Sequence, residues 1–552
     1  MANGAQALMK TLVEAGVEVC FTNPGTSEMH FVAALDSEPK MRAVLALFEG
    51  VATGAADGYA RMADKPAATL LHLGCGLGNG LANLHNARKG KVPVVNIVGD
   101  HATYHVKYDA QLQSDIETVA RNVSPNFVRT SKSTEALCQD AVDAITAARG
   151  LPGQVATLIL PADVSWGESG TPCAMPAPVT PSVADDATIQ TVADAVRTGK
   201  KTAILLGGRA LREPSLLAAA KLAAHNGIKL FAETFPTRIE RGAGLPAVER
   251  IAYLAELATL QLSEYENLIL VDAKPPVSFF AYPGKKSYLV PDTCNVNTLA
   301  TPEQDAAASL NKLADALGAA GAEPKLQASA RPGQPRGKLT AEKVCKALGH
   351  LMPENSIIVD ESITSGLMLN ALTAGAPRHD ILTLTGGAIG QGLPNSVGAA
   401  IACPDRPVYA LIGDGTAMYT IQALWTMARE NLNVTTIIFN NASYSILNVE
   451  LERVGAEEAG AKAKSQLDIS GPVTHYAHLA QSMGVHGVRV QTTEELLKAM
   501  EYAQSMPGPH LIEAVVPESL NGVKRKVLPW LLRTLPSLPR PLTKALKNKI
   551  AP

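Results

Sequence analysis

Short apolar runs alternate along the chain with longer segments in which apolar residues recur every three or four positions. The runs predict buried parallel strands, and the longer period predicts helices that cover the faces of a sheet. The predicted strands are Glu18–Phe21, Ala43–Phe48, Ala67–Leu71, Val92–Val98, Thr202–Leu206, Ile228–Phe231, Asn267–Val271, Pro407–Ile412 and Val434–Phe439. This alternation predicts an α/β protein made of three successive doubly wound parallel-sheet domains.

Two segments enriched in alanine, proline and glycine interrupt the alternation and are typical of linkers. They are Gly170–Ser182 and Gly321–Lys338. At 552 residues the chain is too long for one ordinary core, so about three domains are expected. We expect domains at 1–170, 183–320 and 339–517, followed by a basic tail rich in proline and leucine at 518–552.

Composition narrows the class of protein. Hydrophobic residues make up 46% of the chain, and the net charge of −2 gives no electrostatic reason to expect a nucleic-acid partner. The seven cysteines are scattered without a CxxC pair, which favours reduced thiols in a cytoplasmic protein. The start, Met1–Lys10, lacks an apolar leader, and the chain has no run of about 18 apolar residues. We therefore expect neither a signal peptide nor a transmembrane helix.

The most informative motif is Gly413-Asp414-Gly415, which follows one predicted strand and precedes a segment with helical spacing, Thr416–Glu430. The next predicted strand ends at Asn440-Asn441. Neighbouring parallel strands would deliver a carboxylate and an amide oxygen to one edge of the sheet, where α/β proteins bind ligands. Mg²⁺ prefers such oxygens together with those of phosphates. A turn without a ligand is the alternative for an isolated Gly-Asp-Gly.

With the helix and the Asn pair at this spacing, the segment resembles the thiamine-diphosphate signature of the superfamily that contains pyruvate decarboxylase, benzoylformate decarboxylase and acetolactate synthase. The resemblance implies that Asp414, Asn441 and the carbonyl of Ser443 bind Mg²⁺. The N-terminus of a helix would favour the negative charge of the diphosphate. In this segment the implied cofactor-binding residues are Gly413, Gly415, Thr416, Asn441 and Tyr444.

Leu45–Met62 is similar to the other characteristic segment of the superfamily. In it, Glu49 is followed by a predicted helix that ends in Gly-Tyr-Ala-Arg at 58–61. The resemblance implies that the carboxyl group of Glu49 binds the pyrimidine ring and promotes loss of the thiazolium proton. The cofactor then stores the electrons released on decarboxylation. In the family this Glu meets a cofactor held by another subunit, which implies a homodimer at minimum and a homotetramer as in many relatives. Without the resemblance, Glu49 is a carboxylate stabilised by a helix dipole.

The glycine-rich segment Thr383–Pro394 is the third piece, and a simple loop is its alternative interpretation. The resemblance implies that Ile389 supports the bent cofactor and that the carbonyl of Gly387 accepts a hydrogen bond from its amino group. It also implies that Thr364 contacts the diphosphate.

The first domain bears on the reaction. Asn23–Glu28 resembles a run of benzoylformate decarboxylase in which a Ser contacts the substrate carboxylate, and Thr26 keeps a hydroxyl at that position. His72, followed by a Gly-Leu-Gly-Asn run, resembles the catalytic His of that enzyme, and histidine exchanges protons near neutral pH. A structural role is the alternative for His72. His101 and His105 either line the pocket or lie in a packed or solvated loop.

Two departures limit the resemblance. Phe280 falls near the position of a second decarboxylase His, and a Phe cannot relay protons. Tyr108–Ala120 is similar to acetolactate synthase, but Gln111-Leu112 replaces a Phe-Gln pair of that enzyme. Ala203–Arg212 has no dinucleotide signature, so we do not expect the FAD of that synthase.

We therefore predict a thiamine-diphosphate- and Mg²⁺-dependent carbon–carbon lyase or carboligase, most simply a decarboxylase of a small 2-oxo acid, with Glu49, His72 and Thr26 as catalytic residues. The alternatives are acetolactate-synthase-type carboligation with FAD, and a low-turnover cofactor-binding scaffold or membrane-recruited partner. Leu447–Ser470 is either a lid over the cofactor or an exposed helix and loop. The tail either wraps its own oligomer, which we favour, or makes peripheral contact with anionic lipid.

Overall fold

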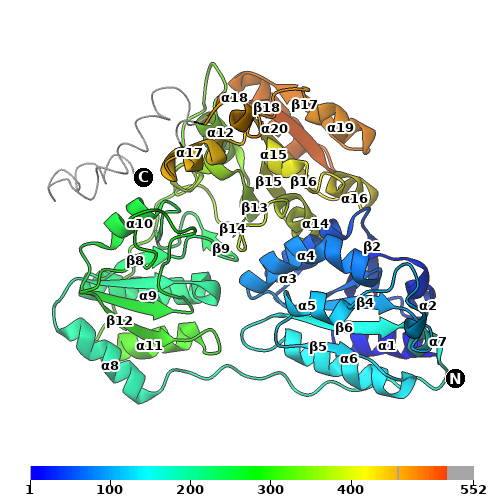
Figure 1. Cartoon of the computed structure of the whole chain (residues 1–552). Helices are drawn as coiled ribbons and strands as arrows, with labels where there is room; N and C mark the ends of the chain where they lie inside the picture. The colour runs from blue at the N-terminus through cyan, green and yellow to red at the C-terminus, as the bar shows by residue number, and fades with distance from the viewer. Residues whose placement is uncertain (1, 457–458, 519–552) are drawn as a thin grey trace.

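Three mostly parallel sheets, each flanked by helices, form the part of the chain described here, residues 2–456 and 459–518 of a computed structural model (Figure 1). The first sheet lies in the blue and cyan region of Figure 1 and the second in the green region, whereas the third runs from yellow-green to orange, with β9 in green at its edge. The named strands pair in parallel, except that β9 (Ile239–Arg241) runs antiparallel to β14 (His379–Thr383). The predicted α/β class with three doubly wound sheets is confirmed.

The first sheet has the strand order β2-β1-β3-β4-β6-β5. Its strands are β1 (Val19–Asn23), β2 (Arg42–Leu45), β3 (Ala67–Leu71), β4 (Val94–Asp100), β5 (Val128–Thr130) and β6 (Val155–Pro161). Its helices are α1 (Gly4–Glu14), α2 (Met29–Ala34), α3 (Glu49–Ala63), α4 (Leu73–Lys89), α5 (Ile116–Arg121), α6 (Thr134–Ala148) and α7 (Ala162–Trp166), with 3₁₀ turns η1 (Thr26–Glu28), η2 (Leu35–Ser37) and η3 (Val106–Tyr108). Because α3 and α4 follow β2 and β3, their N-termini lie at the carboxyl edge of the sheet, where open α/β sheets bind ligands.

The second sheet has the order β10-β8-β7-β11-β12. Its strands are β7 (Thr202–Leu206), β8 (Lys229–Ala232), β10 (Glu249–Arg250), β11 (Asn267–Val271) and β12 (Asn295–Ala300). Its helices are α8 (Asp186–Arg197), α9 (Glu213–Asn226), α10 (Ala255–Leu262) and α11 (Ala306–Ala316), with η4 at Gly208–Leu211.

The third sheet has the order β17-β18-β16-β15-β13-β14-β9. Its further strands are β13 (Ser356–Glu361), β15 (Val408–Gly413), β16 (Val434–Asn440), β17 (His486–Val490) and β18 (His510–Val515). Its helices are α12 (Ala341–Leu351), α13 (Leu369–Leu372), α14 (Gly392–Ala402), α15 (Asp414–Ala417), α16 (Ala423–Arg429), α17 (Ser445–Arg453), α18 (Ala461–Lys464), α19 (Tyr476–Ser482) and α20 (Thr493–Ser505), with η5 at Ile363–Gly366.

The third sheet packs against both of the other units. Neighbouring residues on β13 point to opposite faces of the sheet, as the pleat of a strand requires. Ile357 belongs to a hydrophobic cluster that includes Val51 of α3. Ile358 belongs to a different cluster that includes Leu206 of β7. Two shared hydrophobic cores therefore hold the first and second units against the third, and they position the strand ends that carry the predicted site.

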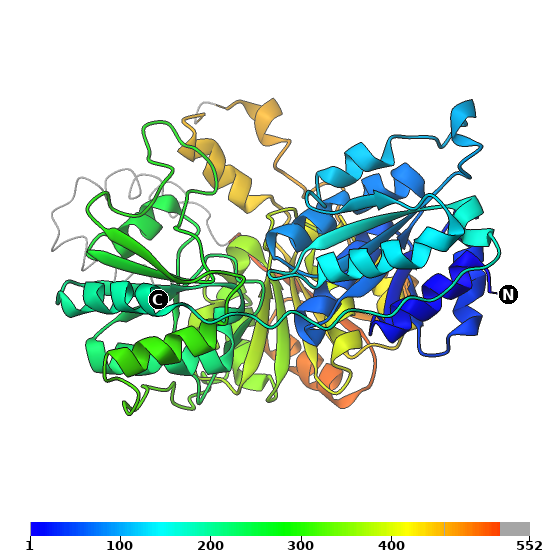
Figure 2. The ribbon, with the colours of Figure 1, turned by 90° about the horizontal axis from the view of Figure 1, so that it is seen from below.

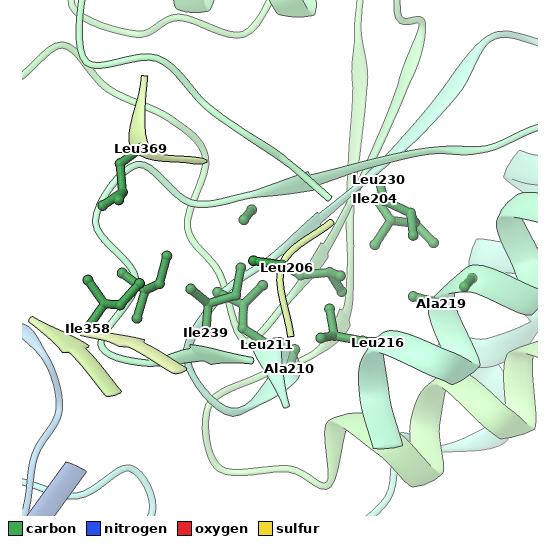
Figure 3. Close-up of a cluster of buried hydrophobic side chains, with 14 of the residues drawn as sticks. Ile204, Leu206, Ala210, Leu211, Leu216, Ala219, Leu230, Ile239, Ile358 and Leu369 are labelled. Carbon is green, nitrogen blue, oxygen red and sulfur yellow. The ribbon is translucent and has the colours of Figure 1, made fainter. Parts of the chain in front are cut away.

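Strand β9 links the second and third units in a way that the sequence did not predict. It lies in the sequence range of the second unit but pairs with β14 at the edge of the third sheet. Figure 3 shows Ile239 of this strand between Leu206 and Ile358 in one continuous cluster of buried side chains. The strand is three residues long, too short for a periodic apolar pattern to reveal it.

The predicted helix Thr416–Glu430 is wrong as one element. The chain forms α15, a turn, and then α16. The hydroxyl of Thr420, in the turn, donates a hydrogen bond to the carbonyl of Gly390, 2.9 Å away. This bond attaches the turn to the glycine-rich segment. The helix is interrupted at this point, between Ala417 and Ala423.

An extended connection joins α7 to α8 and contains the predicted linker Gly170–Ser182; it crosses from the first unit to the second in Figure 2. The predicted domain boundaries stay a prediction. Most of the predicted tail, from residue 519 onward, lies outside the described residues. Among residues 2–456 and 459–518, no helix is both long enough and apolar enough to span a membrane.

Candidate active site

The predicted metal site lies at the carboxyl edge of the third sheet. Strands β15 and β16 pair in parallel with Gly413 opposite Phe439, so Asp414 and Asn441 follow neighbouring strand ends. The Asp414 carboxylate accepts hydrogen bonds from the backbone N–H groups of Gly415 (2.8 Å), Asn441 (2.9 Å) and Ala442 (2.6 Å). Burial raises the pKa of Asp414 above its usual range, and these hydrogen bonds oppose the rise.

The other predicted metal ligands lie beside Asp414. The side-chain oxygen of Asn441 accepts a hydrogen bond from the backbone N–H of Ser443 at 3.0 Å. The hydroxyl of Tyr476, from α19, donates to the backbone carbonyl of Asp414 at 2.9 Å. The sequence did not indicate this support by Tyr476. A carboxylate, an amide oxygen and a carbonyl are hard oxygen donors, and this set fits Mg²⁺ with a diphosphate.

The predicted diphosphate-binding residues surround the start of α15. Gly415 has no room for a side chain, because a Cβ there would lie 2.3 Å from a ring carbon of Tyr444. Thr416 donates its hydroxyl to the carbonyl of Gly413 at 2.7 Å. Thr364 is buried in η5, which packs against β15. These predicted residues therefore gather at one strand end, although their roles stay a prediction.

A buried carboxylate that the sequence did not single out holds the glycine-rich segment. Glu361, the last residue of β13, accepts hydrogen bonds from the N–H groups of Gly390 (2.7 Å), Gln391 (3.1 Å) and Gly392 (2.7 Å). Burial raises its pKa to about 7 in spite of these three donors. The same segment is held from the first unit by Asn86, whose amide donates to the carbonyl of Ala388 at 2.8 Å.

The two predicted cofactor contacts of this segment are half-buried. Gly387 has a φ of 75°, which favours glycine, and a Cβ there would lie 2.5 Å from a ring carbon of Phe279. Ile389 lies two residues further on, next to the backbone that Glu361 anchors. The segment is thus a fixed platform and not a simple loop.

In the first unit, Glu49 and His72 come together. Glu49 is the first residue of α3, and its carboxylate accepts a hydrogen bond from the amide of Asn79 at 3.0 Å. A Cβ on Gly76 would lie 3.2 Å from the Glu49 carboxylate and 3.5 Å from the Cβ of His72. Gly76 therefore lies next to both predicted catalytic residues, and its lack of a side chain leaves room beside them.

The His72 ring is held by a second carboxylate that the sequence did not assign. Its Nδ1 lies 2.8 Å from Glu28, whose side chain is fully buried. Glu28 also accepts hydrogen bonds from the N–H of Gly25 at 2.7 Å and from the hydroxyl of Ser27 at 3.0 Å. A carboxylate accepts hydrogen bonds, so this partner places the hydrogen of the neutral imidazole on Nδ1. Nε2 then carries no hydrogen and is an acceptor. Glu28 lies in the motif quoted above, but its burial could not be read from the sequence.

The predicted Thr26 is exposed, and the hydroxyl of its neighbour Ser27 lies 3.4 Å from Nδ1 of His72. The rings of His101 and His105 are in tilted contact, with centroids 5.2 Å apart and planes inclined by 52°. No hydrogen bond joins either ring to Glu49 or His72 in the described part of the chain.

Aromatic side chains from the second unit reach the glycine-rich segment. Phe279, which touches Gly387, makes edge or tilted contacts with Phe235, Tyr253 and Phe280 at centroid distances of 5.0–5.7 Å. The Phe280 side chain is 57% exposed. Phe280, near which the resemblance places a second decarboxylase His, is thus part of an apolar cluster, and that correspondence stays a prediction.

Helix α17, in the predicted lid, is tied to the second unit. Glu450 accepts hydrogen bonds from the hydroxyls of Tyr253 (3.3 Å) and Tyr282 (2.8 Å). Arg453 forms a buried ion pair with Glu256 at 2.9 Å and lies over the ring of Tyr282. These contacts give α17 a fixed position, so a moving lid stays a prediction for the rest of the segment.

The crevice of the second sheet is filled by carboxylates. Asp272, after β11, accepts hydrogen bonds from the N–H of Arg209 (2.8 Å) and from Lys91 of the first unit (2.9 Å). Glu233, after β8, accepts from the N–H of Gly208 at 2.8 Å. These N–H groups belong to the first strand-to-helix turn, where doubly wound domains bind the phosphates of a dinucleotide. Two carboxylates on this turn do not fit a flavin diphosphate.

Comparison with known proteins gives the family. Residues 2–121 match the family described as "Thiamine pyrophosphate enzyme, N-terminal TPP binding domain", and residues 364–514 match the corresponding C-terminal TPP binding domain. The chain is 55% identical over 522 residues to IlvX of Mycobacterium tuberculosis, provisionally named an acetolactate synthase large subunit, covering 94% of this chain and all of that protein. The chain belongs to the thiamine pyrophosphate enzyme family. The predicted family, the predicted thiamine diphosphate cofactor and the enzymatic nature are confirmed, and Mg²⁺ stays a prediction.

Other relatives of the enzyme are decarboxylases. Benzoylformate decarboxylase of Pseudomonas aeruginosa is 28% identical over 536 residues, which cover 90% of this enzyme and 96% of that one. A solved structure with the same fold is the 4-hydroxybenzoylformate decarboxylase of Rhodococcus jostii RHA1, with a TM-score of 0.81 at 22% identity, covering 94% of this chain and all of that chain. The enzyme is thus a thiamine-diphosphate-dependent protein with both decarboxylase and acetolactate-synthase-like homologues.

Proposed function

We propose that the enzyme decarboxylates a 2-oxo acid without oxidising it, and that this acid carries an apolar or aromatic side chain. The observation that carries the proposal is the His72 ring, fixed by the buried Glu28 beside Glu49. A fixed imidazole with a free Nε2 is suited to exchanging a proton with a substrate near neutral pH.

The residues of the first unit have separate roles in this proposal. Glu49 presents a carboxyl group to the pyrimidine ring, and Asn79 orients it by a hydrogen bond. His72 exchanges a proton at Nε2. The hydroxyl of Thr26, with Ser27 next to it, orients the substrate carboxylate.

The residues of the third unit hold the cofactor. When bound, thiamine diphosphate supplies an electron sink for decarboxylation. Asp414, Asn441 and the carbonyl of Ser443 bind Mg²⁺, for which their oxygens are suited. The remaining cofactor contacts that we propose are Thr364, Gly387, Ile389, Gly413, Gly415, Thr416 and Tyr444.

The aromatic cluster of the second unit supports the choice of substrate. Phe279 touches the Gly387 backbone, and Phe280 next to it is exposed. Rings at this place offer an apolar wall to the side chain of a substrate and exclude water from it. Because Phe279 and Phe280 carry no group that exchanges protons, the proposal assigns proton exchange to His72.

Acetolactate-synthase-type carboligation is the second candidate, and the relationship to IlvX favours it. Glu233 and Asp272 argue against FAD as its additional cofactor, because both carboxylates already occupy the N–H groups of the turn. A purified enzyme without the yellow absorbance of a flavin is the expected result.

A substrate panel separates the two candidates. The holoenzyme is incubated with pyruvate, branched-chain 2-oxo acids and aryl 2-oxo acids, while carbon dioxide, aldehyde and acetolactate are measured. We expect carbon dioxide and aldehyde from the aryl or bulky apolar acids, and a loss of turnover of at least about a hundredfold in Glu49→Gln. Acetolactate from pyruvate as the main product would instead support the second candidate, and unchanged turnover in Glu49→Gln would remove the role of this carboxyl group.

The metal is tested by calorimetric titration of the apoenzyme with thiamine diphosphate, with and without Mg²⁺. We expect binding that requires Mg²⁺, is removed by a chelator, and is weakened at least about tenfold in Asp414→Asn, since a charged ligand is lost. Equal binding without the metal would contradict the proposed site.

The assembly is part of the proposal. Enzymes of this family act on small molecules and commonly form oligomers, and we propose a homodimer at minimum in which Glu49 of one subunit serves the third unit of the other. Large apolar side chains exposed beside both parts of the site, Leu47 and Tyr419, support contact with a second copy. The free cysteines, three of them buried, support a cytoplasmic location.

A further inference from the structure

The aromatic side chains beside the glycine-rich segment form a group of rings in mutual contact. The tip of the Phe279 ring faces Gly387, where a Cβ would lie 2.5 Å from the outermost ring carbon. Phe235 and Tyr253 contact Phe279 with centroids 5.7 and 5.5 Å away, and they lie 6.2 Å from each other. Phe279 is 42% exposed. These two neighbours therefore support part of its ring, and the rest is open to a ligand.

Tyr253 differs from the phenylalanines of this group because its ring has a polar end. Its hydroxyl donates a hydrogen bond to the Glu450 carboxylate of α17 at 3.3 Å. Burial and the charge of Glu450 raise the pKa of Tyr253 to about 12, so the hydroxyl keeps its hydrogen at neutral pH. Tyr253 is thus held at both ends, by Phe279 on its ring and by Glu450 on its hydroxyl.

The carboxylate of Glu450 is itself fixed by other contacts. It accepts the hydroxyl of Tyr282 at 2.8 Å and pairs with Arg453 at 2.9 Å. Arg453 also pairs with Glu256 of α10 at 2.9 Å, so α17 is attached to the second unit, next to which it lies in Figure 1. Helix α17 begins at Ser445, directly after the segment that carries the predicted metal ligands. One carboxylate therefore attaches the aromatic group to the third unit.

We propose that Tyr253 and Glu450 are positioning residues for substrate selection, and that their hydrogen bond holds Phe279 where it contacts an aryl side chain of the 2-oxo acid. This role rests on the proposed function and adds that the preference for aryl over methyl depends on a bond between the second and third units. Contact between two aromatic rings requires a defined distance and angle, so a Phe279 ring that can turn away loses it. A methyl side chain is too small to gain from the contact.

Two probes that do not react measure this preference without turnover. Mandelate and lactate share the carboxylate of the substrate and carry a phenyl or a methyl side chain, but a hydroxyl replaces the ketone, so neither is decarboxylated. Their affinities for the holoenzyme, saturated with thiamine diphosphate and Mg²⁺, are measured by calorimetry. We expect mandelate to bind at least about tenfold tighter than lactate, because only the phenyl ring contacts Phe279. Equal affinities, or no saturable binding of mandelate, would overturn the proposal.

Variants that remove the hydrogen bond test its role. Tyr253→Phe keeps the ring, and we expect the preference for mandelate over lactate to fall at least about threefold, with lactate affinity unchanged. Glu450→Gln should also lower this preference, and Tyr253→Phe should add little in that background, because both changes weaken the same bond. Tyr288→Phe, at an exposed tyrosine of the second unit, is the matched control and should keep the parent preference. An unchanged preference in Tyr253→Phe, or an equal loss of both affinities, would overturn the proposal.

Decarboxylation is measured separately, so that this role and the proposed function can fail independently. With benzoylformate, the 2-oxo acid with a phenyl side chain, Tyr253→Phe should raise KM at least about threefold and leave kcat within about twofold of the parent, because proton exchange stays with His72. An unchanged KM in an active Tyr253→Phe enzyme would overturn the role and leave the proposed function standing. A parent enzyme that decarboxylates no 2-oxo acid would overturn the proposed function, and the mandelate preference would still decide the role of Tyr253.

Discussion

At the scale of single residues, three carboxylates stand out: the buried Glu28 at the end of η1, the buried Glu361 at the end of β13, and the half-buried Glu233 directly after β8. Glu28 holds the His72 ring, Glu361 holds the glycine-rich segment, and Glu233 occupies an N–H of the second crevice. A buried carboxylate is costly unless it is hydrogen-bonded, and each of these three accepts backbone N–H groups. These hydrogen bonds therefore offset the free-energy cost of removing each carboxylate from water.

Replacing Glu28 by Gln tests the positioning of His72. We expect kcat to fall about tenfold to a hundredfold with little change in thiamine diphosphate affinity, because an amide can present an N–H to Nδ1 and turn the ring or change its tautomer. Steady-state kinetics and cofactor titration measure the two effects. Loss of cofactor binding in step with kcat would point to a merely structural role, and Glu28→Asp should recover part of the activity.

Glu233 makes stability depend on pH. Burial raises its pKa from 4.5 to about 7, so between these pH values the folded enzyme binds more protons than the unfolded chain. This contribution to stability is complete below about pH 4.5 and is lost as the pH rises through about 7. Glu233→Gln lacks this loss, so relative to the parent it should gain about 1–3 kcal/mol on going from pH 5 to pH 8. Urea unfolding at both pH values measures it.

Glu342, exposed on α12, supplies the control for this measurement. Glu342→Gln should shift the unfolding midpoint equally at the two pH values. A Glu233→Gln curve parallel to that of the parent would show that the carboxyl group is not held in a dry environment.

At the scale of elements, the segment between β14 and α14 forms the centre of the candidate site. Its glycine content predicted a close approach of the backbone to other groups. In the structure its backbone is hydrogen-bonded by Glu361 at the end of β13, Asn86 from α4 and Thr420 from the turn after α15. The last contact explains why 416–430 is not a continuous helix. Elements that belong to different units thus share one backbone platform.

Gly387→Ala tests whether this platform needs its shape. The positive φ and the contact with Phe279 both oppose a methyl group, so we expect thiamine diphosphate affinity to fall at least about tenfold while the secondary structure stays intact. Cofactor titration and circular dichroism measure these properties. Gly321→Ala, at a glycine with open space around it, is the matched control and should bind the cofactor normally.

At the scale of the whole molecule, the third sheet is the centre and shares a hydrophobic core with each of the other units. The strand ends that carry Asp414 and the helix starts that carry Glu49 belong to different units of this assembly. The proposed homodimer pairs the Glu49 of one chain with the metal ligands of the other.

Mixing two impaired variants tests this arrangement, at a thiamine diphosphate concentration too low to fill the sites that lack Asp414. Glu49→Gln and Asp414→Asn chains are dissociated, mixed in equal amounts and reassembled. In a mixed dimer with shared sites, one site keeps both residues, so we expect about a quarter of the parent activity to return. Sites built within one chain would give no recovery, and each variant treated alone should remain inactive.

Much of the architecture could be predicted because its signals are local. The alternation of apolar runs and helical spacing indicated the three sheets, and residues at strand ends, such as Asp414 and Asn441, marked the site. The glycine-rich segment 383–394 and the segment around Glu49 were the two other motifs visible in the sequence. Each of these signals depends on neighbours in sequence, through the strand and helix periods and the position of a polar residue after a strand.

The sequence by itself determined the class of fold, the family and the residues grouped around the metal motif. Only the tertiary structure decided which carboxylates are buried, and that β9 joins the third sheet with Arg241 opposite His379. The physical reason is that burial and pairing depend on residues far apart in the chain, such as Glu28 with His72 or Arg238 with Asp380. No local pattern encodes these contacts, because packing of one unit against another creates them.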